Sequence, residues 1–460
     1  MSFVSSWLER FGLHRPELRA WAMYDWANSA FVLVVITAVF PIYYESVAAA
    51  GGGLSSERAT EYLGYATTLA LLVLALTSPV LGALADFKAW RKKLLMATVG
   101  VGALATAGLF TIGSGDWQRS LIFFAIGNFC LFLSFVFYDS LLPHIASGDE
   151  LDRVSTAGYA VGYLGSGLLL TFQIFVIQNP GTFGFADGGA ATRWAFLGVA
   201  LWWAVFTLPL LLRVKEPPRA LELDEAVITE DGRESFREVV KVTFQRLGET
   251  LREIRHDYRQ TFLMLVAYMI YNEGIGTIIR MGGIFAASKD FSDTTVITAI
   301  LLLQFVGIPF AFLFGGLAAK LGTKRTIMVG LSVYVVISIL GYLMETENDF
   351  FVMCFLIALV QGGTQGLSRS LFGSMVPKHK ASEFFGFFSV FSKVAGIFGP
   401  LLFALAIRAT GSLNSAVLSV VVLFVAGAIL LLFVDVEAGQ RQAREMDESL
   451  LAEPTVGEAR

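Results

Sequence analysis

Stretches of apolar residues long enough to cross a lipid bilayer recur along the whole sequence. A bilayer core about 30 Å thick needs about 20 apolar residues in one helix, and the chain contains twelve stretches of that kind. Gly, Pro or charge clusters separate them, which favours short turns between helices over the alternating pattern of a membrane barrel. The sequence therefore predicts an all-α polytopic membrane protein with twelve transmembrane helices, which begin near residues 20, 62, 94, 120, 156, 194, 260, 295, 326, 350, 383 and 414.

Side chains that carry metal, cofactor or nucleic-acid chemistry are sparse. Cys130 and Cys354 fall inside apolar stretches and read as buried hydrophobic residues, while the four histidines lie outside the stretches. We therefore expect no metal centre and no cofactor. The net charge is only −4, and the sequence has neither a basic stripe nor a G-x-x-x-x-G-K-[ST] loop, so nucleic acid and nucleotides are not expected partners.

Lysine and arginine are distributed unevenly over the predicted loops. With the N-terminus placed inside, the inner segments carry 26 of the 34 basic residues, the outer segments carry five and the helices carry three. Inner loops of membrane proteins are enriched in these residues. We expect both termini to be cytoplasmic, in an integral protein of the cell's inner (plasma) membrane.

Two landmarks occur twice at almost the same offset. Residues 82–85 (GALA), followed by basic residues, are matched 233 positions later by residues 315–318 (GGLA). Residues 141–144 (LLPH) are matched 234 positions later by residues 375–378 (MVPK). The repeat predicts an N-terminal six-helix half over residues 1–213 and a C-terminal six-helix half over 260–436.

The remaining segments are polar. Residues 214–259 are predicted to form a cytoplasmic linker in which apolar residues from Phe236 to Tyr258 recur at helical spacing. This helix is expected either on the inner membrane surface or packed against the inner ends of the bundle. Residues 437–460 are predicted to be a charged and loose cytoplasmic tail.

Five charged residues interrupt the apolar stretches: Asp25, Glu273, Arg280, Arg369 and Lys393. A charge at that depth costs about 3 kcal/mol or more unless it meets a partner or water. Such residues mark solute and ion pathways more often than simple contacts between helices. They are therefore the first candidates for substrate binding.

The charges of helices one and seven leave alternatives open. Asp25 shares a helical face with Asn28, and a structural pairing of Asp25 with a basic inner loop competes with a substrate or proton role. Glu273 and Arg280 stand seven residues apart on one face. Glu273 is thus a candidate for proton exchange, with a permanent ion pair to Arg280 as the rival interpretation.

Helices five, ten and eleven supply further candidates. Gln365 and Arg369 lie one turn apart, and the planar guanidinium of Arg369 suits a carboxylate. Lys393 is a point charge near mid-membrane. Tyr159 and Tyr163 form an aromatic stripe on helix five that is expected either to orient a small polar ligand or simply to pack.

The turn after the second helix has a recognisable pattern. It reads Gly82, Ala83, Leu84, Ala85 and Asp86, with a basic run that begins at Arg91 and Lys92. Together with six plus six helices, it resembles the major facilitator superfamily of secondary transporters. The resemblance implies that Gly82, Asp86, Arg91 and Lys92 form a cytoplasmic gate, although the basic run also suits a topology signal alone. The second copy has Ala319 in place of the acid.

Three longer motifs narrow the resemblance. Residues 24–31 (YDWANSAF), 363–372 (GTQGLSRSLF) and 383–387 (EFFGF) look like the first, tenth and eleventh helices of the vacuole-effluxer-like branch of that superfamily. This branch includes fungal vacuolar exporters of amino acids. The resemblance implies transport more firmly than it implies a cargo.

These patterns predict a secondary transporter that moves a small polar solute by alternating access. An amino acid or similar zwitterion is the expected cargo, with Arg369 or Lys393 holding its carboxylate and Glu273 or Asp25 available for its amine or for a coupled proton. A carrier of a sugar or an organic anion is the alternative within this class. A membrane-embedded enzyme and a non-transporting receptor or scaffold are alternatives from other classes. We expect a monomer with no enzymatic activity, whose partners are the solute, the lipid bilayer and a candidate coupling proton.

Overall fold

The computed structural model describes residues 8–218, 252, 254–289, 291–394, 396 and 398–452. Within these ranges the chain is almost entirely helical and contains no strand. Residues 219–251 and 253 of the predicted linker lie outside the described residues. They include most of the helix predicted between Phe236 and Tyr258. The predicted all-α class is confirmed.

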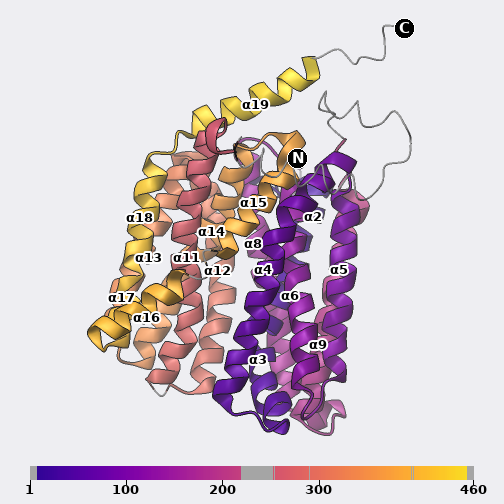
Figure 1. The fold of residues 1–460 in the computed structure, drawn as a ribbon, viewed down its shortest axis with the longest axis vertical. Coiled ribbons are helices and arrows are strands. Elements are labelled where there is room, and N and C mark those ends of the chain that lie inside the picture. Colours follow the sequence, from indigo (N-terminus) through magenta and orange to yellow (C-terminus); the bar gives the residue numbers. More distant parts are fainter. Residues whose placement is uncertain are drawn as a thin grey trace.

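The first half of the bundle, shown from indigo to magenta in Figure 1, begins with a bent segment. Its elements are α2 (Pro16–Ala30), the π-helix η1 (Phe31–Ala38), α3 (Phe40–Tyr43), the π-helix η2 (Tyr44–Ala49), α4 (Ser56–Lys88), α5 (Arg91–Gly108), η3 (Leu109–Thr111), α6 (Trp117–Ser140), α7 (Leu142–Ile145), α8 (Asp149–Gln178), η4 (Pro180–Phe183) and α9 (Gly188–Arg213). Pro41 follows the break between η1 and α3, where its missing N–H ends the helical ladder and the axis turns by 41°.

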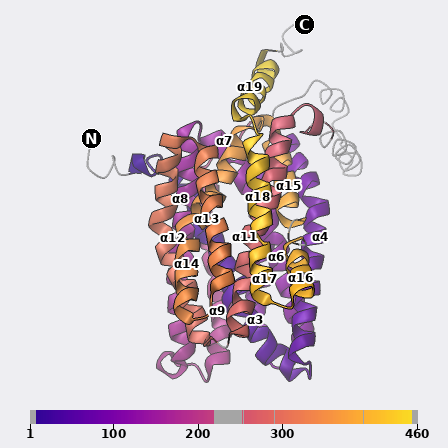
Figure 2. The same ribbon diagram turned by 90° about the vertical axis from the view of Figure 1, so that its left-hand side faces the viewer.

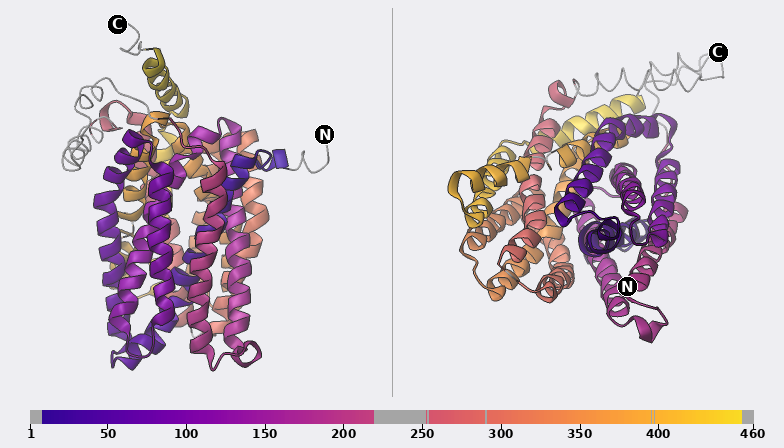
Figure 3. Two further views of the ribbon diagram at one scale, coloured as in Figure 1. Left: turned by 90° about the vertical axis from the view of Figure 1, so that its right-hand side faces the viewer. Right: turned by 60° about the horizontal axis from the view of Figure 1, so that its bottom comes forward.

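The second half lies beside the first (Figures 1 and 3). Its elements are α11 (Arg259–Ser288), α12 (Asp293–Leu321), α13 (Thr323–Leu343), α14 (Glu347–Ser374), η6 (Lys378–Lys380), α15 (Ala381–Val394), α16 (Phe398–Thr410), α17 (Leu413–Ser419), α18 (Val421–Leu432) and α19 (Val436–Ala452). Figure 2 shows α12, α13, α14 and α18 nearly parallel, with α19 projecting beyond one end.

The number of spans in the described chain is consistent with the twelve predicted. Ten helical segments of the described chain are long and apolar enough to cross a membrane, and the bent pair that begins at Pro16 makes eleven. The shorter helices α15 and α16 occupy the region predicted as the eleventh span. We call the end of the bundle where α2 begins and α18 ends, uppermost in Figure 1, the termini end, and the opposite end the far end.

Several helices that start at the far end have capped N-termini. The side chains of Ser55, Asp187, Ser292 and Thr346 accept hydrogen bonds from the first turns of α4, α9, α12 and α14. Thr346 forms a capping box with Asp349. These caps satisfy backbone N–H groups that lack a partner inside the helix, which fixes where each helix begins.

Each half has its own hydrophobic core. One cluster of buried side chains runs from Leu18 to Val214, and a second runs from Ile254 to Val434. The halves meet where glycines allow backbones to approach closely. A Cβ on Gly386 of α15 would lie 2.7 Å from the Pro79 Cα of α4, and one on Gly82 would lie 2.3 Å from the Ser382 carbonyl oxygen. Small residues therefore set the spacing of α4 and α15.

The segment after the last span is helical, so the prediction of a loose tail over 437–460 was wrong for residues 437–452. Helix α19 packs on the termini end of the second half, where Ala443 is buried. Asp447 accepts hydrogen bonds from the backbone N–H of Lys378 at 3.0 Å and pairs with His379 at 3.0 Å. Gln440 donates to Ser374 Oγ at 3.0 Å. The sequence suggested disorder because charged residues dominate this helix, whereas its few inward contacts decide its position.

Replacing Asp447 with asparagine is expected to loosen α19, because the carboxylate serves both the Lys378 backbone and the His379 ring. The expected cost is about 1 kcal/mol, since the site is partly exposed. Amide hydrogen exchange in α19 should accelerate about fivefold. Glu448→Gln is the matched control, because Glu448 is exposed on the same helix. Equal exchange rates in the two variants would remove Asp447 from this role.

Acid should release the same helix. Burial raises the pKa of Asp447, but the hydrogen bonds from His379 and the Lys378 backbone outweigh it and hold this pKa below its usual value of 3.8. A lowered carboxyl pKa contributes stability above the ordinary range near about 4, and that stability is lost as the pH falls through the lowered value. Protection of α19 from hydrogen exchange should therefore decline only below about pH 4, and a decline near neutral pH would contradict this assignment.

Candidate functional site

Arg369 of α14 lies buried between the halves, and its guanidinium is fully engaged by the first half. Its Nη2 donates to Asp25 Oδ2 at 3.1 Å and its Nη1 donates to Asp139 Oδ1 at 3.2 Å. Its Nε donates to Ser155 Oγ at 2.9 Å, and Nη2 also donates to the Ser155 carbonyl at 2.8 Å. We call Asp25, Asp139 and Arg369 the Arg369 triad. It joins α14 to α2, α6 and α8.

Aromatic rings surround the same guanidinium. Its central carbon lies 4.7 Å from the Trp21 ring, 4.8 Å from the Tyr159 ring and 5.5 Å from the Tyr138 ring. Each ring face attracts a cation and shields it from other acceptors. Trp21 stands one turn before Asp25 on α2, and Tyr138 directly precedes Asp139 on α6. Each of the two acids therefore has an aromatic neighbour on its own helix.

Asp25 is held by more than Arg369. The Tyr138 hydroxyl donates to its Oδ2 at 2.9 Å, and Asn28 Nδ2 donates to its Oδ1 at 3.3 Å. Gly158 of α8 makes room for this arrangement, because a Cβ there would lie 2.2 Å from Asp25 Oδ2. Sequence reasoning placed Asp25 and Asn28 on one face correctly. It did not identify Arg369 as the partner in place of a basic inner loop.

A second ion pair lies within the second half. Arg280 Nη2 donates to Glu273 Oε1 at 2.7 Å, which agrees with their predicted position on one face of the helix. The same oxygen accepts from Thr277 Oγ1 at 3.2 Å and from the Gly399 backbone N–H of α16 at 2.9 Å. Glu273 is buried, whereas the Arg280 side chain is 43% exposed. This geometry corresponds to the ion-pair interpretation of Glu273, with part of Arg280 left accessible.

Lys393 of α15 reaches across to the first half without meeting an acid. Its Nζ lies 3.7 Å from the centre of the Phe132 ring on α6. Among the described residues it has neither an ion pair nor a hydrogen bond. Asp139, Glu273 and Arg280 are near enough to interact with it electrostatically. Lys393 is therefore an embedded cation whose charge the neighbouring side chains do not neutralise by contact.

A polar contact closes the termini end between α4 and α15. Asp86 pairs with Arg91 at 2.5 Å and accepts from the backbone N–H groups of Ser382 at 3.1 Å and Glu383 at 2.9 Å. Arg91 Nε donates to Ser382 Oγ at 3.0 Å. The carboxylate thus sits at the N-terminus of α15, where helix dipoles favour negative charge. The predicted gate residues Gly82, Asp86 and Arg91 meet here.

The start of α5 is held by Glu216, which follows the end of α9. The backbone N–H groups of Arg91 and Lys92 donate to its carboxylate at 2.9 and 2.8 Å. Glu216 therefore caps the start of α5, next to the predicted gate.

A second polar contact closes the same end between α8 and the second half. Asp152, in the first turn of α8, accepts from Thr323 Oγ1 at 2.6 Å and from Ser370 Oγ. Because the repeated turn has Ala319 in place of an acid, the carboxylate here comes from the opposite helix. Lys324, which stands where the first copy has Arg91, donates instead to the Leu432 and Val434 carbonyls at 2.8 Å each.

Among the described residues, carboxylates of the first half accept hydrogen bonds from the second half. They are Asp25, Asp86, Asp139 and Asp152. The groups of the second half that donate to them are the Arg369 guanidinium, two backbone N–H groups of α15 and the hydroxyls of Thr323 and Ser370. Opening this end would break these hydrogen bonds together.

The remaining predicted residues lie on the walls between the halves. Tyr159 packs on Arg369, as described above. Tyr163 inserts its ring between α12 and α14, where Cβ atoms on Gly307 and Gly362 would lie 2.9 and 2.7 Å from it. Its hydroxyl is buried without a hydrogen-bond partner in the described chain. Gln365 is half-buried one turn before Arg369.

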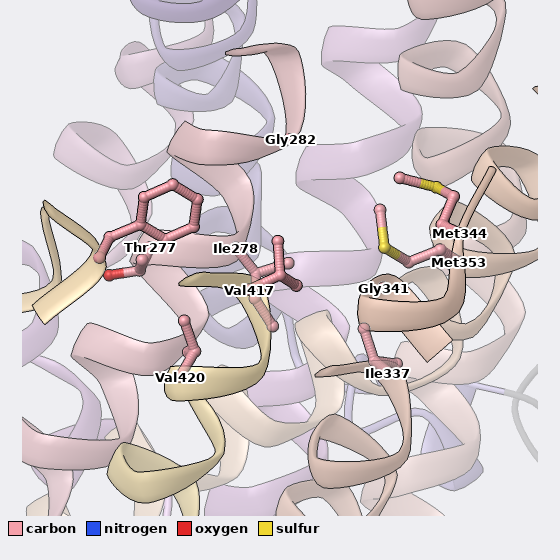
Figure 4. A pocket seen from close by; sticks show the side chains of 10 residues that line it. Thr277, Ile278, Gly282, Ile337, Gly341, Met344, Met353, Val417 and Val420 are labelled. Carbon is pink, nitrogen blue, oxygen red and sulfur yellow. The ribbon is translucent and has the colours of Figure 1, made fainter. Parts of the chain in front are cut away.

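A separate apolar pocket opens inside the second half (Figure 4). It encloses about 370 Å³, including the solvent at its mouth, and is lined by Thr277, Ile278, Gly282, Ile337, Gly341, Met344, Met353, Phe403, Val417 and Val420. None of these ten side chains is charged. Thr277 links this pocket to the site, because its hydroxyl donates to Glu273.

Sequence reasoning missed Asp139 as a site residue. It lies at the last turn of α6, which made it look like a surface carboxylate. Only the approach of α14 encloses it. The sequence feature that could have indicated a role for Asp139 is its position directly after Tyr138 in a largely apolar helix.

Replacing Gly158 with alanine is expected to separate Asp25 from Arg369, because the new methyl group would occupy the space of the carboxylate and lie 3.1 Å from Arg369 Nη2. Disrupting a buried ion pair costs about 3 kcal/mol, so the thermal unfolding temperature should fall clearly. Gly100→Ala is the control, because no neighbouring atom lies within 4 Å of a Cβ there. Equal unfolding temperatures for the two variants would contradict the tight fit at Gly158.

The sequence is similar to those of one protein family. The model of the family described as "Vacuole effluxer Atg22 like" matches residues 14–444. An uncharacterized MFS-type transporter, YxiO of Bacillus subtilis, is 35% identical over 93% of this chain and 97% of its own length. Autophagy-related protein 22 of Pyricularia oryzae is 21% identical over 94% of this chain and 78% of its own length.

Among solved structures, the fold is similar to the major facilitator proton:xylose symporter XylE bound to 6-bromo-6-deoxy-D-glucose. The TM-score is 0.68 and the identity 13%, over 96% of this chain and 99% of that one. These relatives are transporters and not enzymes. The chain therefore belongs to the vacuole effluxer Atg22-like family and is a transporter of the major facilitator superfamily.

Proposed function

We propose that this transporter moves a small zwitterionic solute, such as an amino acid, by alternating access between its two halves. The observation that carries the proposal is Lys393, the embedded cation that no described side chain neutralises. A buried charge without a partner is costly. A solute carboxylate would remove that cost when it binds.

The other embedded cations support this choice by elimination. All three donor nitrogens of Arg369 already have acceptors in the first half. Arg280 is paired with Glu273 but remains 43% exposed, so one edge of its guanidinium is accessible. We assign the solute carboxylate to Lys393, with Arg280 as its second contact. In the state described here, Arg369 serves as a tie between the halves.

Neutral and acidic groups complete the proposed site. We propose that Gln365 of α14 offers hydrogen bonds to the solute and that two rings of α8, Tyr159 and Tyr163, form an aromatic wall. We propose Asn28 of α2, which donates to Asp25, as a further polar group of the site. Glu273 is close enough to Lys393 to interact with it, and we propose it as the group that meets the solute amine. Small-molecule sites in bundles combine such a few polar groups with apolar walls.

We propose that the termini end faces the cytoplasm of a cell whose plasma membrane holds the protein, because the basic residues concentrate there. The contacts of Asp86 and Asp152 then close the cytoplasmic side in this state. The two hydrophobic cores support rigid halves, here residues 1–213 and 260–436, joined by the linker 214–259. We propose a monomer as the transporting unit, with Gly82, Asp86, Arg91 and Lys92 at its cytoplasmic gate.

A carrier of organic anions is the second candidate, and the same observation favours it. Lys393, Arg280 and Glu273 together carry one net positive charge when all are ionised. A monoanion without an amine would neutralise that charge. The two candidates differ in whether the solute needs its ammonium group.

Replacing Lys393 with glutamine is expected to weaken solute binding, because the carboxylate loses a charge-assisted contact of about 2 kcal/mol. This corresponds to about a 30-fold increase in Kd. Thermal-shift titrations of the purified protein with single amino acids and with their deaminated carboxylic acids provide the measurement. Lys393→Arg should retain part of the affinity.

Lys320→Gln serves as the control, because Lys320 is exposed at the termini end. Binding of amino acids but not of the deaminated acids supports the zwitterion, and the reverse supports the organic anion. Unchanged affinity in Lys393→Gln, or proteoliposomes that carry none of these solutes under any gradient, would count against the proposal.

A further inference from the structure

We propose that Asp139 is the residue that binds the coupling proton and releases it when the termini end opens. The inference rests on the proposed transport function and adds its coupling group. It starts from the number of charges in the Arg369 triad. Two carboxylates share one guanidinium there, and all three residues are buried.

The surplus negative charge belongs to Asp139 and not to Asp25. Asp25 accepts three hydrogen bonds, from Arg369, Tyr138 and Asn28. Asp139 accepts one among the described residues, from Arg369 Nη1 at 3.2 Å, which is the longer of the two ion-pair contacts. A carboxylate that gains few hydrogen bonds keeps little compensation for its lost hydration. Of the two acids, Asp139 is therefore the one that is more easily neutralised by a proton.

The groups that face Asp139 agree with this assignment. They are Asp25 and Tyr24 from α2, Tyr138 from α6, Tyr159 from α8, Tyr268 from α11, Arg369 from α14 and, at longer range, Lys393 from α15. All of them except Arg369 and Lys393 are acidic or neutral. Arg369 is shared with Asp25, and Lys393 makes no ion pair with Asp139. The remaining embedded or gate acids have a cation or donors of their own: Glu273 has Arg280, and Asp86 has Arg91.

The position of Asp139 couples the proton to the gate. Asp139 directly precedes Ser140, whose Oγ lies 2.9 Å from Ser382 Oγ in the closing contact of α15. When α14 and α15 move away, Arg369 leaves Asp139 and water reaches it from the termini end. The O–H bond of the protonated carboxyl then breaks, the electron pair stays on Asp139, and a water molecule takes the proton. The proton is thereby released to the side on which the gate has opened.

Infrared spectroscopy of the full-length protein tests the protonated group without any transport. At neutral pH the wild type should show the carbonyl band of a buried carboxylic acid, which resists exchange with the solvent. This band should disappear in Asp139→Asn and persist in Asp149→Asn, the matched control at an exposed position in the first turn of α8. A band that persists unchanged in Asp139→Asn overturns the proposal.

Transport in proteoliposomes tests the coupling. With single radiolabelled amino acids as probes, the wild type should accumulate solute against its gradient when a pH gradient is imposed. Asp139→Asn should lose this accumulation at least tenfold while keeping exchange at equal pH, and Asp139→Glu should restore it. Accumulation by Asp139→Asn at the wild-type level, or wild-type flux that ignores the pH gradient, overturns the assignment of Asp139. No wild-type flux of any probe would instead contradict the proposed function, and the infrared result would still decide where the proton is bound.

Discussion

The cost of holding a charge away from water governs the arrangement of this protein. Arg369 illustrates this cost, because its guanidinium is buried between four helices of the bundle. Each of its donor nitrogens meets an acceptor, and three aromatic rings lie around it. Because these acceptors come from α2, α6 and α8 while Arg369 belongs to α14, satisfying one charge also fastens two halves that have separate cores. The same requirement explains why Gly158 has no side chain at this point.

The two closing contacts at the termini end show how an ancestral repeat can diverge without losing its geometry. In the first contact the acid lies at the end of α4 and points at the N-terminus of α15. In the second, Ala319 occupies the equivalent position, and Asp152 supplies the carboxylate from the facing helix, α8. Each contact still pairs one carboxylate of the first half with donors of the second. Because the acids of these two contacts lie on one half and their donors on the other half are neutral, the halves can separate without leaving like charges face to face.

Two embedded charges are balanced less completely than the others. Asp25, Glu273 and Asp86 each have a basic partner, whereas Lys393 has no acid in contact among the described residues and Asp139 shares Arg369 with Asp25. Lys393 of α15 rests on Phe132 of α6, which lies seven residues before Asp139 on the same helix. That separation is about 10 Å along a helix. In the proposed cycle, Lys393 gains stability when a solute carboxylate binds and Asp139 gains stability when a proton binds.

The sequence by itself determined the helical class, the membrane, the two-fold repeat and the list of embedded charges, because each follows from local hydrophobicity and spacing. It also placed Glu273 and Arg280 on one face of one helix, while it left open whether they form an ion pair. Tertiary structure alone decided that Asp25 meets Arg369, 344 residues away, that Asp139 is enclosed although it ends its helix, and that α19 docks through Asp447. It also decided that Lys393 points at a phenyl ring and meets no carboxylate of the described residues. These outcomes depend on how closely helices that are far apart in the sequence approach one another. Helical periodicity contains no information on the distance between two helices.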